Sequence, residues 1–423
     1  MTIYSDSLFL ICLDNDEVVF SKNADKKKHP ASLTKVVTAA VVLDNCDNVE
    51  QIITVPEECI TELSGTGSSL GGLKAGEEIS VYNLLCCLLL QSANEAATTL
   101  ADFITNGDRN AFIDKMNNLA KDLGCSNSHF VNPHGLDDDD QYISAEDMAK
   151  LFAYAYSKPV FAEICGMSSY RIPETNMHKE HTITSTNYTL SSGYREYYSK
   201  YLKGGKTGST SVAGHCLVSA ASYGGYNYVS VALDAPKEDF DNDGWDENGA
   251  FLDTKAIVDY AFSNFELVAV ADPDRIVAQL PVKFAKGTDV VPLCSTEKVF
   301  RLLPNDTDIS SLLVKIVSGS EPKHIIAPIK AGEVICKAEV YYADSVRAEI
   351  DLMAASDIKT GPLTVILSVL SFIFDSSLFR LLFAIVIIAI ISVLLFFIFT
   401  KKKKKTGKKY KIYNYTDFVN KKR

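Results

Sequence analysis

Apolar and polar residues follow several different patterns along the chain, and the N-terminal patterns predict one mixed domain. Residues 7–20 carry two apolar runs around a polar turn, which predicts a β-hairpin. Residues 215–222 and 228–233 flank a Gly-Gly turn and predict two further strands. Helical spacing predicts helices over residues 32–43, 81–90, 95–104, 111–123 and 254–262. We therefore expect an α+β domain over residues 1–263, an antiparallel sheet with a helical insertion.

A different pattern begins near residue 264. Short strand-like runs are separated by turn residues, and they cover residues 276–284, 290–293, 312–317 and 346–352. This pattern predicts a separate, small all-β domain over residues 264–357.

The longest uncharged segment runs from Leu381 to Phe399, with Ser392 as its only polar residue. A helix of this length spans roughly 28 Å, close to the hydrocarbon thickness of a bilayer. Five lysines follow at once, and basic residues stay on the cytoplasmic side. We expect a transmembrane helix over residues 379–400, a basic cytoplasmic tail over residues 401–423, and an extracytoplasmic N-terminal part. The apolar run 363–374 is too short to span and predicts an interfacial segment within juxtamembrane residues 358–378.

Composition and charge narrow the function classes. The chain of 423 residues is 47% hydrophobic and 22% charged, which is typical of globular proteins. Its formal net charge of −11 argues against a nucleic-acid partner. Ten cysteines without a CxxC pair or zinc-ligand spacing predict buried thiols, with no essential disulfide and no metal site. Residues 1–6 hold no export signal, so either a leader lies upstream of Met1 or the C-terminal span directs insertion.

Ser32 and Lys35 lie three residues apart where a loop enters a predicted helix, so they share one helical face. A serine hydroxyl is a weak nucleophile until a base takes its proton. A lysine can be that base when burial and a second cation lower its pKa. Amides at the helix N-terminus are available for a developing oxyanion. Taken alone, the pair is a frequent chance pattern, because a capping serine and a surface lysine also produce it.

Two further motifs follow in order: Ser92-Ala93-Asn94, at the end of the helix 81–90, and Lys206-Thr207-Gly208-Ser209, before the strands that follow residue 213. SxxK, SxN and KTG in this order are the motifs of penicillin-recognising serine enzymes. Most of residues 7–355 resembles the membrane-bound D-alanyl-D-alanine carboxypeptidases, the low-molecular-weight penicillin-binding proteins. Besides the three motifs, the resemblance lies in residues 22–25, 73–77, 130–136, 142–149 and 232–235. It implies a penicillin-binding or β-lactamase-like transpeptidase domain, a small β-domain and a C-terminal anchor.

The resemblance implies a catalytic role for three residues. Ser32 would attack the carbonyl between the two terminal D-alanines of a peptidoglycan stem peptide. Lys35 would be the base, and Ser92 would relay a proton toward the leaving amine. Water would then hydrolyse the acyl-enzyme, β-lactam antibiotics would acylate the same serine as inhibitors, and no cofactor or metal would be needed.

Five residues would bind the substrate. Asn94 would hold the substrate backbone and Lys35, while Lys206 would supply the positive field that keeps Lys35 neutral. Thr207 would bind the terminal carboxylate. Gly208 would leave room for the substrate to pair as an extra strand. The backbone amides of Ser32 and Ser209 would form the oxyanion hole.

Residues 238–247 are strongly acidic, whereas relatives often place a basic residue near the substrate carboxylate, and Lys237 is the only nearby candidate. Asp239, Asp241, Asp243 and Gly244 match an EF-hand loop, but its twelfth position is Ala250, so a solvated loop is the favoured interpretation.

Two other segments invite functional interpretations. His134 is expected to hydrogen-bond in a turn rather than to catalyse, because a Ser–Lys pair needs no histidine. The tyrosine-rich segment 194–201 is expected to border the cleft.

The sequence therefore predicts a D-Ala-D-Ala carboxypeptidase anchored in the cell membrane through residues 379–400. Its alternatives are a D,D-endopeptidase that acts on cross-links, and a catalytically silent protein that senses β-lactams or binds the cell wall. A class A β-lactamase is less favoured, because no acidic residue for deacylation is evident and the β-domain and anchor would be unnecessary.

Overall fold

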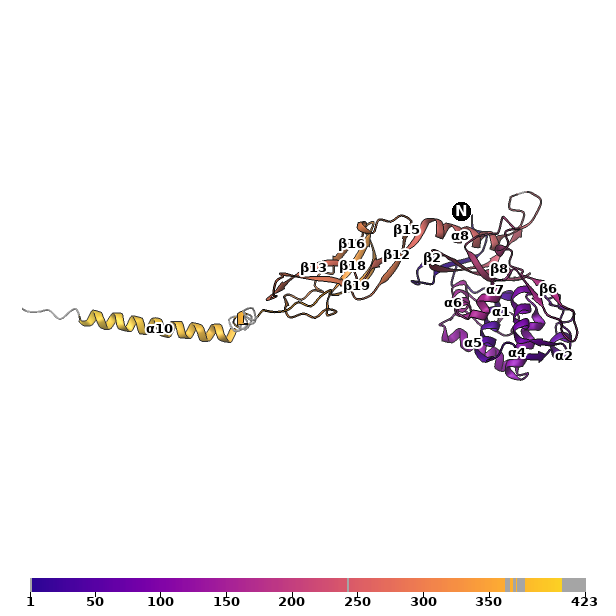
Figure 1. Ribbon diagram of the computed structural model, residues 1–423, viewed down its shortest axis with the longest axis horizontal. Coiled ribbons are helices and arrows are strands. Elements are labelled where there is room, and N and C mark those ends of the chain that lie inside the picture. Colours follow the sequence, from indigo (N-terminus) through magenta and orange to yellow (C-terminus); the bar gives the residue numbers. More distant parts are fainter. Residues whose placement is uncertain (1, 242, 362–365, 368–369, 371–376, 405–423) are drawn as a thin grey trace, which may run out of the picture. The chain divides into compact units, whose positions relative to one another are not determined.

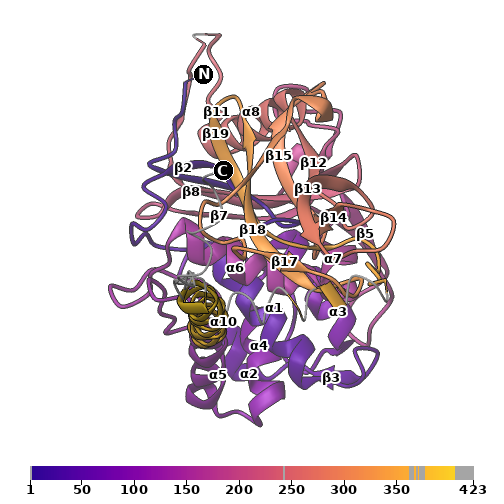
Figure 2. The same cartoon turned by 90° about the vertical axis from the view of Figure 1, so that its left-hand side faces the viewer.

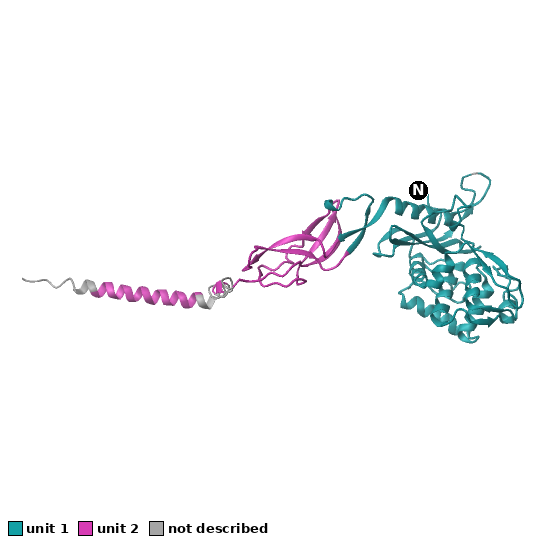
Figure 3. Ribbon diagram, in the orientation of Figure 1, with its two compact units in different colours: residues 1–270, 299–311 teal, residues 271–298, 312–423 magenta. Residues whose placement is uncertain are grey.

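The computed structural model describes residues 2–241, 243–361, 366–367, 370 and 377–404. Its internal contacts divide the chain into two compact units (Figure 3). Unit 1 comprises residues 1–270 and 299–311, and unit 2 comprises residues 271–298 and 312–423. The predicted domain boundaries at residues 263, 357, 378 and 400 stay predictions.

A five-stranded antiparallel sheet organises unit 1, in the order β2-β1-β9-β8-β7. Its strands are β1 (Ser7–Cys12), β2 (Val18–Lys22), β7 (Leu202–Thr210), β8 (Gly214–Tyr223) and β9 (Tyr226–Ala235). The predicted hairpin and the two strands after residue 213 are confirmed. Strand β7 was not expected, because its three glycines and two lysines hide the apolar alternation of a strand.

The helices of unit 1 confirm the predicted helical insertion, with ends shifted by a few residues. They are η1 (Ala31–Leu33), α1 (Thr34–Asn45), α2 (Glu57–Thr61), α3 (Val81–Cys86), η2 (Cys87–Gln91), α4 (Asn94–Thr105), α5 (Arg109–Asp122), α6 (Ala145–Tyr156), α7 (Pro159–Cys165), η3 (Tyr188–Leu190) and α8 (Gly249–Asn264). Short two-stranded sheets join them: β3 (Ile52–Thr54) with β4 (Glu78–Ser80), β5 (Ser169–Ile172) with β6 (His181–Thr184), and β10 (Lys237–Glu238) with β11 (Glu247–Asn248).

Alternate residues of the central strands face two separate cores. Phe9 packs into the larger core together with the helical insertion, while Leu8 and Leu10 pack into a second core together with α8. This alternation is the period of two that a strand imposes. Figures 1 and 2 show α1, α4 and α5 on one side of the sheet and α8 on the other. All ten cysteines are free thiols, and all except Cys46 are buried.

Unit 2 is built on a six-stranded sheet in the order β16-β18-β19-β14-β13-β17, so the predicted small all-β domain is confirmed. Its strands are β13 (Ile276–Lys283), β14 (Val290–Ser295), β16 (Leu313–Ile316), β17 (Ile325–Ile326), β18 (Val334–Tyr342) and β19 (Ser345–Ala354). Two further strands, β12 (Phe265–Ala271) and β15 (Val299–Pro304), pair with each other. Except for Ala271, they belong to unit 1, as does the short helix η4 (Ile309–Ser311).

Helix α10 (Ser377–Lys404) contains the long apolar segment. Within the described part of the chain, its stretch Arg380–Thr400 is the one helix that is long and apolar enough to cross a membrane. The predicted interfacial segment 363–374 lies largely outside the described residues.

Candidate active site

Ser32 lies at the entry to helix α1. The single turn η1 covers Ala31–Leu33, and α1 begins at Thr34, so the chain is already helical between Ser32 and Lys35. The Lys35 Nζ atom lies 2.8 Å from the Ser32 Oγ atom, and it donates to the carbonyl oxygen of His134 at 2.6 Å. The amine that the sequence predicted as a base is therefore within hydrogen-bonding reach of the serine hydroxyl.

Lys35 and Lys206 are both fully buried. Burial lowers the pKa of Lys35 well below its usual value, the positive charge of Lys206 lowers it further, and the negative charge of Glu95 opposes the shift. Burial also lowers the pKa of Lys206 to about 7. Because an ammonium group out of water is costly, the neutral amine of Lys35 is favoured, and only the neutral amine can accept a proton.

Ser92 follows the buried apolar segment, whose final turn is the π-helix η2. The backbone of Ser92 is left-handed, with φ of 64°, and its Oγ atom accepts a hydrogen bond from the Lys206 Nζ atom at 3.0 Å. Asn94 is buried at the first residue of α4. Among the described residues, Lys35 forms hydrogen bonds to Ser32 and His134, and none joins it to Asn94 as the sequence led us to expect.

The KTG motif lies on the edge strand β7, which passes close to η1. The Lys206 Nζ atom donates to the carbonyl oxygen of Thr207 at 2.7 Å, and the Thr207 Oγ1 atom lies 2.5 Å from that of Thr186. A Cβ atom at Gly208 would lie 3.2 Å from the Ser32 backbone nitrogen. Glycine at this position therefore allows the strand to approach the serine closely.

A cleft of about 460 Å³ joins the three motifs. Five of the predicted site residues line it: Ser32, Ser92, Thr207, Gly208 and Ser209. The other three are buried: Lys35 lies behind Ser32, Lys206 lies behind Ser92, and Asn94 follows Ser92 by two residues. Residues 32, 92 and 206, far apart in the sequence, thus meet at one place.

The remaining walls of the cleft include residues that the motifs do not reveal. Tyr194 and Tyr197 line it, which confirms that the tyrosine-rich segment borders the cleft. Tyr188 also lines it and stacks on Tyr194 with ring centroids 4.2 Å apart. Ser69 and Thr186 also line the cleft, and no sequence signal marked either of them.

Lys237 lines the same cleft, together with His215. Burial lowers the pKa of His215, and the positive charge of Lys237 lowers it further. Lys237 was the only basic candidate near the acidic segment 238–247, and in the structure it faces the cleft.

His134 hydrogen-bonds within a turn, as expected. Its Nδ1 atom accepts from the backbone N–H of Leu136 at 3.2 Å. Burial, followed by the positive charges of Lys35 and Arg109, lowers the pKa of His134 to about 3, so the imidazole is neutral. The sequence did not predict the role of the His134 backbone, whose carbonyl oxygen accepts the second hydrogen bond of Lys35.

The acidic loop brings its carboxylates together. One oxygen from each of Asp239, Asp241, Asp243 and Glu247 lies within 4.8 Å of the others. Ala250, the twelfth position of the EF-hand pattern, is buried in the first turn of α8 and offers no side-chain ligand. These carboxylates are exposed or half-exposed, and acidic clusters at protein surfaces are common without an ion.

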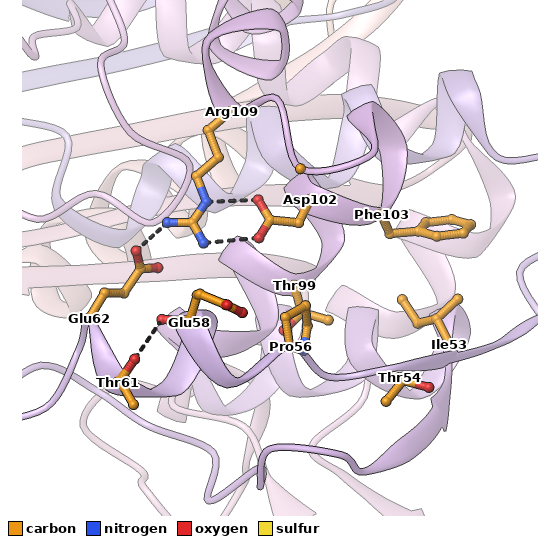
Figure 4. A pocket seen from close by; sticks show the side chains of 11 residues that line it. Ile53, Thr54, Pro56, Glu58, Thr61, Glu62, Thr99, Asp102, Phe103 and Arg109 are labelled. Atoms are coloured by element: carbon orange, nitrogen blue, oxygen red, sulfur yellow. Dashed lines mark hydrogen bonds and ion pairs between the residues drawn. The ribbon is translucent and has the colours of Figure 1, made fainter.

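A second cavity, of about 850 Å³, lies toward the other end of α4 (Figure 4). Three of its charged groups pair with one another: Arg109 forms two hydrogen bonds to Asp102 and a further one to Glu62. None of the predicted site residues lines this cavity. It therefore has no part in the chemistry of Ser32.

A serine in contact with a buried lysine, next to a second buried lysine on an edge strand, defines a serine acyl-transfer enzyme of the penicillin-recognising class. Residues 1–237 match the family of D-alanyl-D-alanine carboxypeptidases, Peptidase_S11, and residues 265–360 match the C-terminal domain of penicillin-binding protein 5. The chain belongs to this D-alanyl-D-alanine carboxypeptidase family of serine peptidases.

Individual relatives agree with the family assignment. The chain is 28% identical over 355 residues to the D-alanyl-D-alanine carboxypeptidase DacF of Bacillus subtilis, covering 84% of this chain and 85% of the relative. It is 30% identical over 339 residues to DacA of Escherichia coli, covering 79% and 78%. The fold is similar to that of penicillin-binding protein 5 from Haemophilus influenzae, with a TM-score of 0.65 and 24% identity over 85% of this chain and 98% of the other.

Proposed function

We propose that this carboxypeptidase removes the terminal D-alanine from peptidoglycan stem peptides through an acyl-enzyme on Ser32. The observation that carries the proposal is the fully buried Lys35 amine, 2.8 Å from the Ser32 Oγ atom and close to a second buried lysine. This arrangement supplies a neutral base to a half-buried nucleophile that lines the cleft.

In acylation, the Lys35 amine takes the Ser32 hydroxyl proton as the Oγ atom bonds to the carbonyl carbon between the two D-alanines. The backbone N–H groups of Ser32 and Ser209 stabilise the oxyanion of the tetrahedral intermediate. The intermediate collapses when the C–N bond breaks. The Ser92 hydroxyl, held by Lys206, gives its proton to the leaving amine and receives in exchange the proton that Lys35 took from Ser32, so Lys35 is neutral again.

In deacylation, the same base acts on water. Lys35 takes a proton from the water that attacks the ester carbonyl, and it returns this proton to the Ser32 oxygen as that oxygen leaves. A β-lactam forms the same ester on Ser32, but its leaving group stays attached to the acyl part. β-Lactams are therefore expected to inhibit the enzyme.

The substrate lies along β7, where Gly208 leaves space for an extra strand. Its terminal carboxylate binds Thr207, next to the hydroxyl of Thr186, and the cation of Lys237. Asn94 holds the substrate backbone.

Release of D-alanine from a pentapeptide that ends in D-Ala-D-Ala tests the proposed function. The full chain in detergent is expected to release one D-alanine per peptide. A cross-linked dimer peptide, offered in parallel, measures endopeptidase action. Penicillin labelling without any release of D-alanine would support the alternative of a silent β-lactam sensor. That alternative and the endopeptidase are not favoured, because the family model and the relatives DacF and DacA, which match more than three quarters of the chain, are carboxypeptidases.

Replacement of Lys237 by alanine is expected to raise the KM for the pentapeptide about tenfold and to change kcat little, because one exposed charge-assisted hydrogen bond contributes about 1–2 kcal/mol. Steady-state release of D-alanine measures both constants. Lys121→Ala removes an exposed lysine of α5 that lines no part of the cleft, and it serves as the control. Equal KM values for the two variants would show that Lys237 does not bind the carboxylate.

We further propose that α10 anchors the enzyme in the cell membrane as a single pass, with the catalytic unit outside and the basic tail inside. Its apolar stretch Arg380–Thr400 is long enough to span, and lysines 401–405 follow it. The full chain is expected in the membrane fraction of the expressing cells, and a chain that ends at Asp357 in the soluble fraction. Recovery of the full chain as a soluble protein without detergent would argue against the anchor.

A further inference from the structure

Glu95 directly follows the SxN motif, and its carboxylate binds the backbone of a separate loop. The residue is 1% exposed. Its Oε1 atom accepts hydrogen bonds from three successive backbone N–H groups, those of Gly71 at 2.5 Å, Gly72 at 2.9 Å and Leu73 at 3.3 Å. Its Oε2 atom is buried and has no hydrogen-bond partner among the described residues. Three N–H dipoles that converge on one oxygen form a concave site that suits an anion.

The loop that Glu95 holds, residues 69–73, reaches the substrate cleft. Ser69 lines the same cleft as Ser32, and the Ser69 carbonyl accepts a hydrogen bond from the Asn94 backbone N–H at 3.0 Å. A Cβ atom at Gly71 would lie 3.0 Å from the Cβ atom of Ala93, so the loop packs directly on the SxN segment. Loop 69–73 is thus attached to residues 93–95 at both of its ends.

We propose that Glu95 is a positioning residue that fixes loop 69–73 as one wall of the substrate cleft. This inference rests on the proposed function of the cleft and adds a residue to it. Without the negative charge, as in Glu95→Gln, the three N–H groups keep only a neutral amide oxygen, which accepts hydrogen bonds more weakly than a carboxylate. Because residues 69–73 are exposed or half-exposed, weaker hydrogen bonds to Glu95 compete less well with water, and the loop is expected to open more often and to take Ser69 with it.

A second consequence separates this role from simple stabilisation of the fold. The negative charge of Glu95 raises the pKa of Lys35, against the effects of burial and of Lys206. Removal of that charge therefore lowers the pKa of Lys35 further. The acylation rate is expected to fall at low pH as Lys35 becomes protonated. In the variant, this fall, the acid limb of the pH profile, is expected to move to lower pH.

The test uses Glu95→Gln in the full chain, in detergent, because this substitution keeps the shape and removes the charge. Its matched control is Asp147→Asn. Asp147 is also buried, and it accepts hydrogen bonds from the backbone N–H of Asn127 and from the Ser128 hydroxyl. The loop that contains Asn127 and Ser128 does not line the cleft. Three quantities are compared: amide hydrogen exchange of residues 69–73 without ligand, the rate constant of acylation by penicillin, and the pH dependence of that rate.

Glu95→Gln is expected to speed exchange at residues 71–73 by tenfold or more, to slow acylation about tenfold and to move its acid limb to lower pH. Asp147→Asn is expected to lower the melting temperature and to leave all three quantities at wild-type values. Wild-type exchange at residues 71–73 in Glu95→Gln, or an acid limb that stays in place, would overturn the proposal. The exchange measurement needs no catalysis, so it tests this inference separately from the proposed function. The proposed function fails if penicillin does not acylate the wild-type chain.

Discussion

Replacement of Lys35 by methionine is expected to slow acylation by penicillin about 10³-fold while the chain stays folded. The effect is large because Lys35 is the one base within hydrogen-bonding reach of the Ser32 hydroxyl among the described residues. A positioned general base contributes about 10²–10⁴-fold to a rate. Methionine keeps the unbranched shape and fills the same buried space. Stopped-flow measurement with a fluorescent penicillin gives the rate constant.

The same substitution changes how stability depends on pH. Lys35 has a lower pKa in the folded chain than in the unfolded chain, so between these two values the unfolded state binds more protons. The free energy of unfolding therefore rises with pH over that interval, by about 1.4 kcal/mol per pH unit for one such group. Lys35→Met is expected to remove this slope. Urea unfolding at pH 7.5, 8.5 and 9.5 measures the difference between the two chains.

Lys28→Met is the matched control for Lys35→Met. The Lys28 side chain is mostly buried and forms ion pairs with Asp6 and Asp234. Its removal is expected to cost stability and to leave acylation within twofold of wild type. Acylation of Lys35→Met at more than a tenth of the wild-type rate would mean that another group takes the serine proton.

Replacement of Gly135 by alanine is expected to reduce acylation by more than 100-fold, although Gly135 contains no reactive group. A Cβ atom there would lie 1.9 Å from the Ala31 carbonyl oxygen and 2.5 Å from its carbon. Real atoms do not approach so closely, so either the 31–33 turn or the 133–136 turn must move. Ser32 follows Ala31, and the His134 carbonyl that holds Lys35 precedes Gly135. A displacement of about 1 Å at such a site costs roughly 10²-fold in rate.

Gly107→Ala separates this clash from the cost of the backbone conformation. Gly107 has φ of +85° and Gly135 has φ of +91°, but a Cβ atom at Gly107 would meet nothing within 4 Å. Both variants carry the strain of a left-handed alanine, about 1 kcal/mol. Only Gly135→Ala is expected to lose acylation, with both chains folded by circular dichroism. Similar acylation by the two variants would contradict the close contact between Gly135 and Ala31.

Local signals in the sequence predicted much of the fold. The hairpin at residues 7–20, the strands around the Gly224-Gly225 turn and the amphipathic helices follow from periodicity, which depends on neighbours in the chain. Strand β7 could not be predicted in this way. Its three glycines allow close tertiary contacts and do not follow the preferences of a strand: Gly208 approaches Ser32, Gly204 approaches Cys165, and Gly205 approaches Val218. The π-helical end of the segment 81–91 was also missed, because its hydrophobic pattern does not distinguish η2 from a continuing α-helix.

The site was predictable to the extent that it is contained in short motifs. Ser32, Lys35, Ser92 and Lys206 were found because their spacing and order match a known pattern. The His134 carbonyl, Thr186 and Ser69 were not found, because each reaches the site through tertiary contacts and has no sequence mark of its own. Their contributions depend on geometry that only the folded chain shows.

Mass spectrometry of the penicillin adduct tests the central claim most directly. The full chain is incubated with benzylpenicillin, digested, and the modified peptide is sequenced. The account predicts one penicilloyl group, on Ser32, and none in Ser32→Ala treated in the same way. An adduct on another residue, or an equal adduct in Ser32→Ala, would contradict the assignment of Ser32 as the nucleophile.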